Sequence, residues 1–120
     1  MGLTYVTVRL KSAAGNGLSY EHAFLVDTGA TDSMVPGNEL AKIGIAKAGE
    51  MSYELADGTI QKYPFGIATI EFMGELTAGR VIFGPDNAEP LLGVTALESV
   101  GIAVDPAHKT LKRLPAIPLK

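Results

Sequence analysis

The chain has 120 residues, of which 47% are hydrophobic and 19% charged, a balance typical of a globular protein with one domain. Its formal net charge of -3 provides no basic field, which argues against nucleic acid as a partner because such binding depends on neutralising phosphates. Cysteine is absent, and this excludes disulfides, a thiolate nucleophile and a zinc–thiolate site.

Membrane association has no support in the sequence. No window of about 18 apolar residues occurs, and the N-terminal segment lacks a basic region followed by an unbroken apolar run. We therefore expect a soluble, cytoplasmic protein that does not contact membranes, with one domain over residues 1–120.

The first predicted element is a β-hairpin. Residues 5–10 alternate apolar and polar side chains, the period of a half-buried strand. Gly15-Asn16-Gly17 is a turn signal, and residues 19–26 read as the returning strand. This strand ends in three apolar residues, and Asp27 follows them directly.

A short helix and two more hairpins are predicted next. Residues 36–44 indicate the helix, with Asn38 as its N-cap and Gly44 at its end. Asp57-Gly58, within residues 51–65, predicts a hairpin with a two-residue type I′ turn. Two strand-like runs, residues 65–72 and 76–83, predict the second of these hairpins.

The C-terminal third predicts a buried strand, a helix and a last hairpin. Leu91-Leu92-Gly93 is a short apolar run, and helical spacing follows until Gly101. Residues 102–104 and 110–114 flank Asp105-Pro106 and predict the small hairpin. The expected fold is therefore mostly β with two short helices.

Asp27 is the candidate functional residue because a carboxylate after an apolar strand is costly to bury without a partner. A partner cation, a fan of backbone N–H groups or partial protonation would offset that cost. Gly29 lets the chain fold back so that amides reach the carboxylate, and Thr28 adds a hydroxyl. On these residues alone, Asp27 could equally cap a turn at the strand end.

Three motifs together carry a family resemblance. Val26-Asp27-Thr28-Gly29-Ala30, the Asp57-Gly58 hairpin and Leu91-Leu92-Gly93 resemble, in that order, the retropepsin-like (retroviral-type) aspartic proteases. The likeness runs from about Tyr5 to Leu114 and is greatest to the bacterial members with a single domain. It implies a closed, β-barrel-like acid protease domain that forms a C2 homodimer.

The resemblance implies aspartic endopeptidase chemistry on extended peptide segments with apolar side chains. Two carboxylates face one water: one removes its proton and the other, protonated, supports the carbonyl oxygen. The chain has one Asp-Thr-Gly, so Asp27 of each subunit would meet across the twofold axis and the pair would share a proton. By the same resemblance, Thr28 would brace the two loops and Gly29 would contact the substrate backbone.

Further site residues are also implied by the resemblance. Ala30, Thr31 and Asp32 would lie along the substrate, although the retroviral relatives usually carry aspartate where Thr31 stands. The hairpin over residues 53–63 resembles the flap that closes over substrate, rather than an ordinary surface hairpin. Its expected substrate-binding residues are Leu55, Ala56, Asp57, Gly58, Thr59 and Ile60, with Leu55 and Ile60 facing each other. Leu91, Leu92 and Gly93 would be structural, packed behind the loop that carries Asp27.

Other chemistries have no support. His22 and His108 are isolated, so we expect no metal site and no cofactor. No serine stands in a nucleophile elbow. The competing interpretation is a catalytically silent module of the same fold that binds peptides or dimerises.

Overall fold

The computed structural model describes residues 3–119, which form nine β-strands and two short α-helices. In chain order their bounds are β1 Tyr5–Ser12, β2 Ser19–Asp27, β3 Ser33–Pro36, α1 Gly37–Lys42, β4 Gly49–Glu54, β5 Ile60–Phe72, β6 Glu75–Gly84, β7 Leu91–Gly93, α2 Val94–Ser99, β8 Ile102–Asp105 and β9 Thr110–Arg113.

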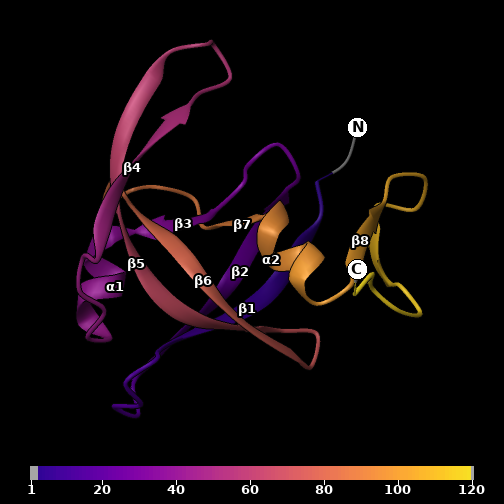
Figure 1. The fold of residues 1–120 in the computed structure, drawn as a ribbon, viewed down its shortest axis with the longest axis horizontal. Coiled ribbons are helices and arrows are strands. Elements are labelled where there is room, and N and C mark those ends of the chain that lie inside the picture. The colour runs from indigo at the N-terminus through magenta and orange to yellow at the C-terminus, as the bar shows by residue number, and fades with distance from the viewer. Residues whose placement is uncertain (1–2, 120) are drawn as a thin grey trace.

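Six of the strands close into a barrel. They are hydrogen-bonded in the order β1-β2-β7-β3-β6-β5, and β5 pairs back onto β1. The hairpin of β4 and the first part of β5 extends away from the barrel, and β8 with β9 forms a separate two-stranded sheet on the opposite side (Figure 1). The expectation of a mostly-β, barrel-like fold with two short helices is confirmed.

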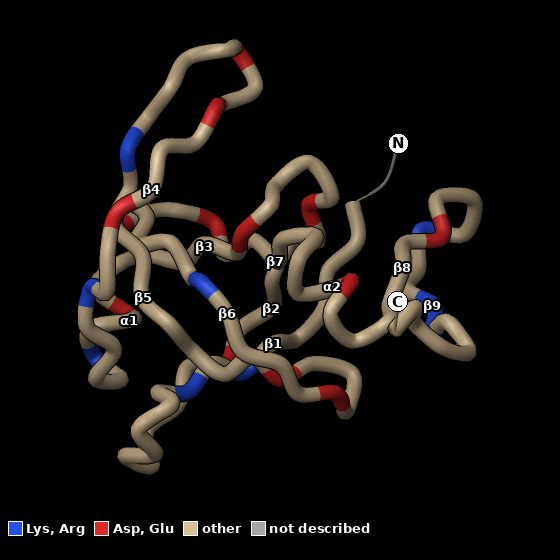
Figure 2. The backbone as a smooth tube through the Cα atoms, in the orientation of Figure 1, with Lys and Arg blue, Asp and Glu red and all other residues tan. Residues whose placement is uncertain are grey.

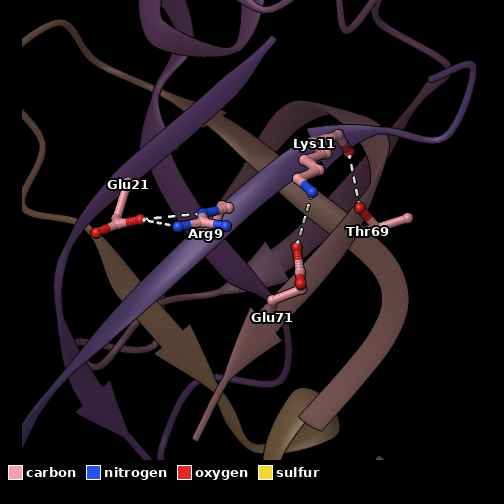
Figure 3. Close-up of polar contacts among 5 residues, drawn as sticks. All are labelled: Arg9, Lys11, Glu21, Thr69 and Glu71. Atoms are coloured by element: carbon pink, nitrogen blue, oxygen red, sulfur yellow. Dashed lines mark hydrogen bonds and ion pairs between the residues drawn. The ribbon is translucent and has the colours of Figure 1, made fainter. Parts of the chain in front are cut away.

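The barrel closes where β1 meets β5, and this seam carries ion pairs on its outer face (Figure 3). Lys11 Nζ lies 3.3 Å from Glu71 Oε1, and the Thr69 hydroxyl donates to the Lys11 carbonyl over 3.3 Å. On the other side of β1, Arg9 binds Glu21 of β2 at 2.7 Å. Exposed pairs of this kind contribute little to stability, so the seam depends on its backbone ladder and the core beneath it.

The hydrophobic core fills the barrel and extends beneath both helices. Leu40 of α1 and Leu97 of α2 are buried, which fixes each helix against the sheet. The strands place alternate side chains inside, as the period of two requires. Core members are Val8, Leu10, Phe24, Val35, Leu40, Ile43, Ile45, Ala68, Ile70, Phe72, Val81, Leu92, Ala96, Leu97 and Ile102.

The first helix confirms its predicted end but not its predicted start. It begins at Gly37 with Pro36 in the N-cap position, so Asn38 lies inside the first turn and the prediction of Asn38 as N-cap is wrong. At the other end Gly44 adopts φ 79° and its N–H bonds to the Ala41 carbonyl, while the N–H of Ile45 bonds to the carbonyl of Leu40. This is the Schellman pattern in which glycine ends a helix.

The β4–β5 hairpin does not contain the predicted two-residue type I′ turn. Its last paired residues are Glu54 and Ile60, so Ile60 does not face Leu55, and Leu55 bonds to Thr59 instead. A type I′ turn needs positive φ at both central residues, but of the two only Gly58 has it, at 86°. The Asp57 carboxylate accepts from the N–H and hydroxyl of Thr59, which stabilises the wider loop.

Two consecutive turn residues with positive φ do occur, but in the next hairpin, between β5 and β6. Phe72 pairs with Glu75, leaving Met73 and Gly74 as a two-residue turn with φ values of 53° and 77°. The strand before it is continuous from Ile60 to Phe72, so the two strand segments predicted on either side of residue 65 are one element. Its length lets it serve both the projecting hairpin and the barrel.

Elements after residue 90 follow the prediction, whereas β3 was not anticipated. The strand Leu91–Gly93, the helix that follows it and the hairpin of β8 and β9 are confirmed. β3 runs parallel to β6 and contacts β7 through Met34 and Leu91. Its four residues complete the barrel between two strands that are distant from it in sequence.

Gly93, the last residue of β7, lies at the tightest backbone contact near the strand ends. A Cβ atom on Gly93 would lie 2.6 Å from the carbonyl carbon of Asp32 and 2.8 Å from the carbonyl oxygen of Thr31. Its N–H donates to the buried hydroxyl of Ser33 over 3.0 Å. Only a residue without a side chain fits this approach without moving the backbone.

We therefore expect Gly93→Ala to destabilise the fold by about 1–3 kcal/mol or more, since the clash is with main-chain atoms that cannot rotate away. The measurement is urea denaturation monitored by circular dichroism. Gly79→Ala is the matched control, because a Cβ at Gly79 would meet nothing within 4 Å. Equal midpoints for the two variants would contradict the close-approach explanation.

Candidate active site

Asp27 is the last residue of β2, where it pairs with Gly93 of β7. The chain turns at once: the Ala30 N–H donates to the Asp27 carbonyl over 3.1 Å, and the Gly29 N–H donates to the Asp27 Oδ1 over 3.0 Å. The residue is half-buried, so the carboxylate lies at the surface of the barrel rather than in its core. Among residues 3–119, one backbone N–H donates to this carboxylate, rather than a fan of them.

The start of α2 supports the loop of residues 28–32. The Val94 N–H donates to the Ala30 carbonyl over 2.8 Å, and the Thr95 N–H donates to the Thr31 carbonyl over 3.2 Å. These amides belong to the first turn of the helix, where they have no partner within it. The loop is therefore held by backbone hydrogen bonds on the side away from the carboxylate.

A cleft of about 660 Å³ opens between this loop and the β4–β5 hairpin. The volume falls within the range usual for ligand sites. It is lined by Asp27, Gly29, Ala30, Thr31, Asp32, Met34, Met51, Ser52, Tyr53, Glu54, Leu55, Ala56, Tyr63, Arg80, Ile82 and Leu91.

The cleft contains about half of the residues that the sequence nominated. Those that line it are Asp27, Gly29, Ala30, Thr31, Asp32, Leu55, Ala56 and Leu91. Of the residues nominated as catalytic or substrate-binding, those that do not line it are Thr28, Asp57, Gly58, Thr59 and Ile60; Leu92 and Gly93, which were expected to be structural, do not line it either. Thr28 is exposed beside the site, residues 57–60 lie at or near the tip of the hairpin, and Leu92 and Gly93 are buried.

Eight lining residues were not among the nominated site residues. They are Met34, Met51, Ser52, Tyr53, Glu54, Tyr63, Arg80 and Ile82. A signal existed for Met51 and Tyr53, because they alternate with Leu55 and therefore share one face of a strand. Met34 and Ile82 are opposite each other in the parallel pairing of β3 with β6, and no local sequence pattern predicts that contact.

The charged groups that line the cleft are the carboxylates of Asp27, Asp32 and Glu54 and the guanidinium of Arg80. The Tyr53 hydroxyl donates to Asp32 Oδ2 over 2.6 Å, a short bond that joins the hairpin to the loop. The pKa of Tyr53 is raised well above its ordinary value. Burial of the phenol is the largest cause, and the hydrogen bond to Asp32 and the negative charge of Asp32 add to it. The Arg80 guanidinium stacks over the Phe65 ring, 4.8 Å from its centroid, and makes no ion pair with any residue between 3 and 119.

Neither a metal-ligand cluster nor a membrane-crossing helix occurs in the part of the chain that the structure describes. Over positions 3–119, no three His, Asp or Glu side chains gather as a metal site requires. Neither helix in this range is long and apolar enough to cross a membrane. Lys and Arg positions are spread over several elements (Figure 2). The cleft with Asp27 is therefore the best-developed candidate site in this part of the chain.

A comparison with known protein families finds one match. The sequence model of a family described as gag-polyprotein putative aspartyl protease matches residues 14–99, which include Asp27, the hairpin and β7. A search of curated proteins found no match to the chain.

Solved structures show the same fold. The protease of EIAV, complexed with the inhibitor HBY-793, has a TM-score of 0.60 at 16% identity, covering 87% of this chain and 93% of its own. A retropepsin-like aspartic protease from Rickettsia conorii has 0.56 at 22%, covering 88% and 78%. The retroviral protease-like domain of Ddi1 from Leishmania major has 0.53 at 18%, covering 96% and 92%. The fold is therefore retropepsin-like.

The raised pKa of Tyr53 predicts a loss of stability in alkali. Above about pH 10 the unfolded chain ionises this tyrosine while the folded chain keeps its proton, so the free energy of unfolding falls as pH rises. We expect Tyr53→Phe to show a smaller fall between about pH 9 and about pH 11 in urea denaturation. Tyr5 and Tyr20, whose pKa values are also raised, remain in both proteins and contribute equally to both. If the free energy of unfolding falls equally with pH in the wild type and in Tyr53→Phe, the prediction is contradicted.

Proposed function

We propose that this chain, which belongs to the family of gag-polyprotein putative aspartyl proteases, is an aspartic endopeptidase that acts as a homodimer. The observation that carries the proposal is the position of Asp27, which lies at a strand end, on a tight glycine turn, facing a cleft of peptide-binding size. The retropepsin-like fold supports the same chemistry.

The proposed mechanism needs a second carboxylate, and a second copy of the chain would provide it. Peptide hydrolysis by this chemistry uses one aspartate to take a proton from water while the other, protonated, binds the carbonyl oxygen. Two adjacent carboxylates cannot both ionise at low cost, so the Asp27 pair would share one proton. Because a C2 axis presents the same residue from both sides, one Asp-Thr-Gly per chain suffices.

The loop geometry suits that arrangement. Asp27 Oδ1 is held by the Gly29 N–H, and the Ala30 N–H closes the turn behind it, so the carboxylate is oriented before a partner arrives. Thr28 is exposed beside it and would reach the partner's loop. Pre-orientation of this kind lowers the cost of bringing the two acids and the water together.

The substrate would be an extended peptide with apolar side chains near the cut. Met34, Ile82 and Leu91 form an apolar surface on the barrel side of the cleft, and Met51 and Leu55 form another on the hairpin side. Side chains of an extended peptide point alternately to opposite sides, so they would meet these two surfaces in turn. The hairpin would act as a flap over the bound segment.

Asp27→Asn tests the chemistry. It removes a charge and keeps the shape, and we expect cleavage of a diverse peptide mixture to fall about 10²–10⁴-fold or more. Mass-spectrometric profiling between about pH 4 and about pH 8 measures it, since the protonation of a carboxylate pair sets the optimum. Asp86→Asn, which changes an exposed aspartate between β6 and β7, is the matched control.

Two outcomes would contradict the proposal. Identical cuts from the wild type and Asp27→Asn would place the activity in another residue or another protein. A wild type that cleaves nothing, yet retains peptides in a binding assay, would favour the silent peptide-binding module of the same fold.

Mixing experiments test the shared dyad. When wild type and Asp27→Asn chains exchange freely at saturating concentration, random pairing leaves about one half of the wild-type activity at equal amounts and about one quarter at threefold excess of the variant. The measurement is peptide cleavage after exchange, with analytical ultracentrifugation to report the dimer. If adding the Asp27→Asn variant leaves the peptide-cleavage activity of the wild type unchanged, a single chain would be enough for catalysis.

A further inference from the structure

One hydrogen bond connects the projecting hairpin, defined as residues 49–64, to the loop that carries Asp27. The Tyr53 hydroxyl donates to Asp32 Oδ2 over 2.6 Å, and both residues are half-buried in the cleft wall. A hydroxyl bound to a carboxylate at this distance belongs to the short, charge-assisted class. Among residues 3–119 it is the only hydrogen bond between this hairpin and an element other than the β5 strand it continues into.

The loop end of this contact is rigid. The backbone of Asp32 lies against Gly93, where even a Cβ atom would not fit. Thr31 is held by the amide of Thr95, and Ser33 is buried with its hydroxyl bound to the Gly93 N–H. Asp32 therefore has firmly placed neighbours on both sides, and its carboxylate is a fixed point on the barrel.

The hairpin end has little else to hold it. β4 is the last strand of the sheet and pairs only with β5, and the β5 residues before Phe65 pair with no strand of the barrel. The polar side-chain bonds of Asp57 and Thr59 are internal to the hairpin tip. An element attached along one strand opens at low free-energy cost, so a single strong contact has a large effect on its position.

We propose that Tyr53 is a positioning residue, which docks the hairpin onto the loop through Asp32 and so fixes the hairpin wall of the cleft relative to Asp27. The inference rests on the proposed function for its consequence in catalysis. The docking itself is a property of the fold and can be tested without any substrate. Since Tyr53 acts through Asp32 and not on the reacting atoms, its loss should weaken substrate binding more than it slows the chemical step.

Hydrogen–deuterium exchange tests the docking directly. We expect Tyr53→Phe to raise exchange in peptides covering residues 49–64 by roughly tenfold to a hundredfold, the effect of losing one charge-assisted hydrogen bond. Peptides covering β6 should be unchanged, which separates local release of the hairpin from global unfolding. Tyr63→Phe is the matched control, because Tyr63 lines the same cleft, packs 6.3 Å from Tyr53 and donates no hydrogen bond in the described residues.

A second variant identifies the partner. Asp32→Asn keeps the shape but removes the charge, so it should raise exchange in the hairpin by a smaller factor than Tyr53→Phe. The double variant should exchange no faster than Tyr53→Phe alone, since both changes remove the same bond. Additive effects, or hairpin exchange in Tyr53→Phe equal to the wild type, would overturn the proposal.

Kinetics then connects the docking to catalysis. With a cleaved peptide, Tyr53→Phe should raise KM several-fold with a smaller change in kcat. If the wild type cleaves no peptide, the proposed function fails, while the exchange data still decide the docking. If cleavage occurs but hairpin exchange does not respond to Tyr53→Phe, only the docking fails.

Discussion

The contact between Gly93 and the backbone of Thr31 and Asp32 is the constraint on which the site depends. β7 must lie between β2 and β3, parallel to the first and antiparallel to the second, and this leaves no space for a side chain at its last residue. Gly93 is also the residue that pairs with Asp27 in the sheet. The position of β7 therefore determines how deeply the Asp27 carboxylate lies in the cleft. The position of the carboxylate therefore follows from backbone pairing rather than from side-chain packing.

The local environment of Asp27 resolves the conflict between an apolar strand and a charged end. Burial declines along β2 from Phe24, which is fully buried, to Asp27, which is half-buried beside the cleft. The carboxylate keeps part of its surface exposed, and within residues 3–119 the Gly29 N–H is its one backbone donor. The larger electrostatic cost would arise only when a second carboxylate approaches, and a shared proton removes most of it.

Local patterns predicted the elements whose partners are close in sequence. Alternating runs with glycine turns gave the hairpins, and helical spacing before Gly44 and Gly101 gave the helix ends. β3 was not predicted from the sequence because it has only four residues, one of them a proline, and because its partners β6 and β7 are distant in sequence. The same non-local pairing brings Met34 and Ile82 into the cleft, so these two lining residues could not be read from the sequence.

Side-chain chemistry explains the turn that was mispredicted. Asp57-Gly58 favours a type I′ turn when the backbone alone decides, but here the Asp57 carboxylate binds Thr59 and holds a longer loop. Met73 and Gly74 both adopt the left-handed conformation with positive φ, although methionine has no intrinsic preference for it. The continuous ladder between β5 and β6 fixes that register, so tertiary pairing overrides local preference.

An enzyme and a peptide-binding module of this fold would use the same cleft. Its apolar surfaces on the barrel and on the hairpin would accommodate an extended peptide in either case, and the docking of Tyr53 onto Asp32 would hold the hairpin in place equally well. What differs is the demand on Asp27: a binding module has no need of a carboxylate there, whereas hydrolysis requires it to meet a second one. The decisive geometry is therefore not the shape of the cleft but the distance that a partner chain would set between two copies of Asp27.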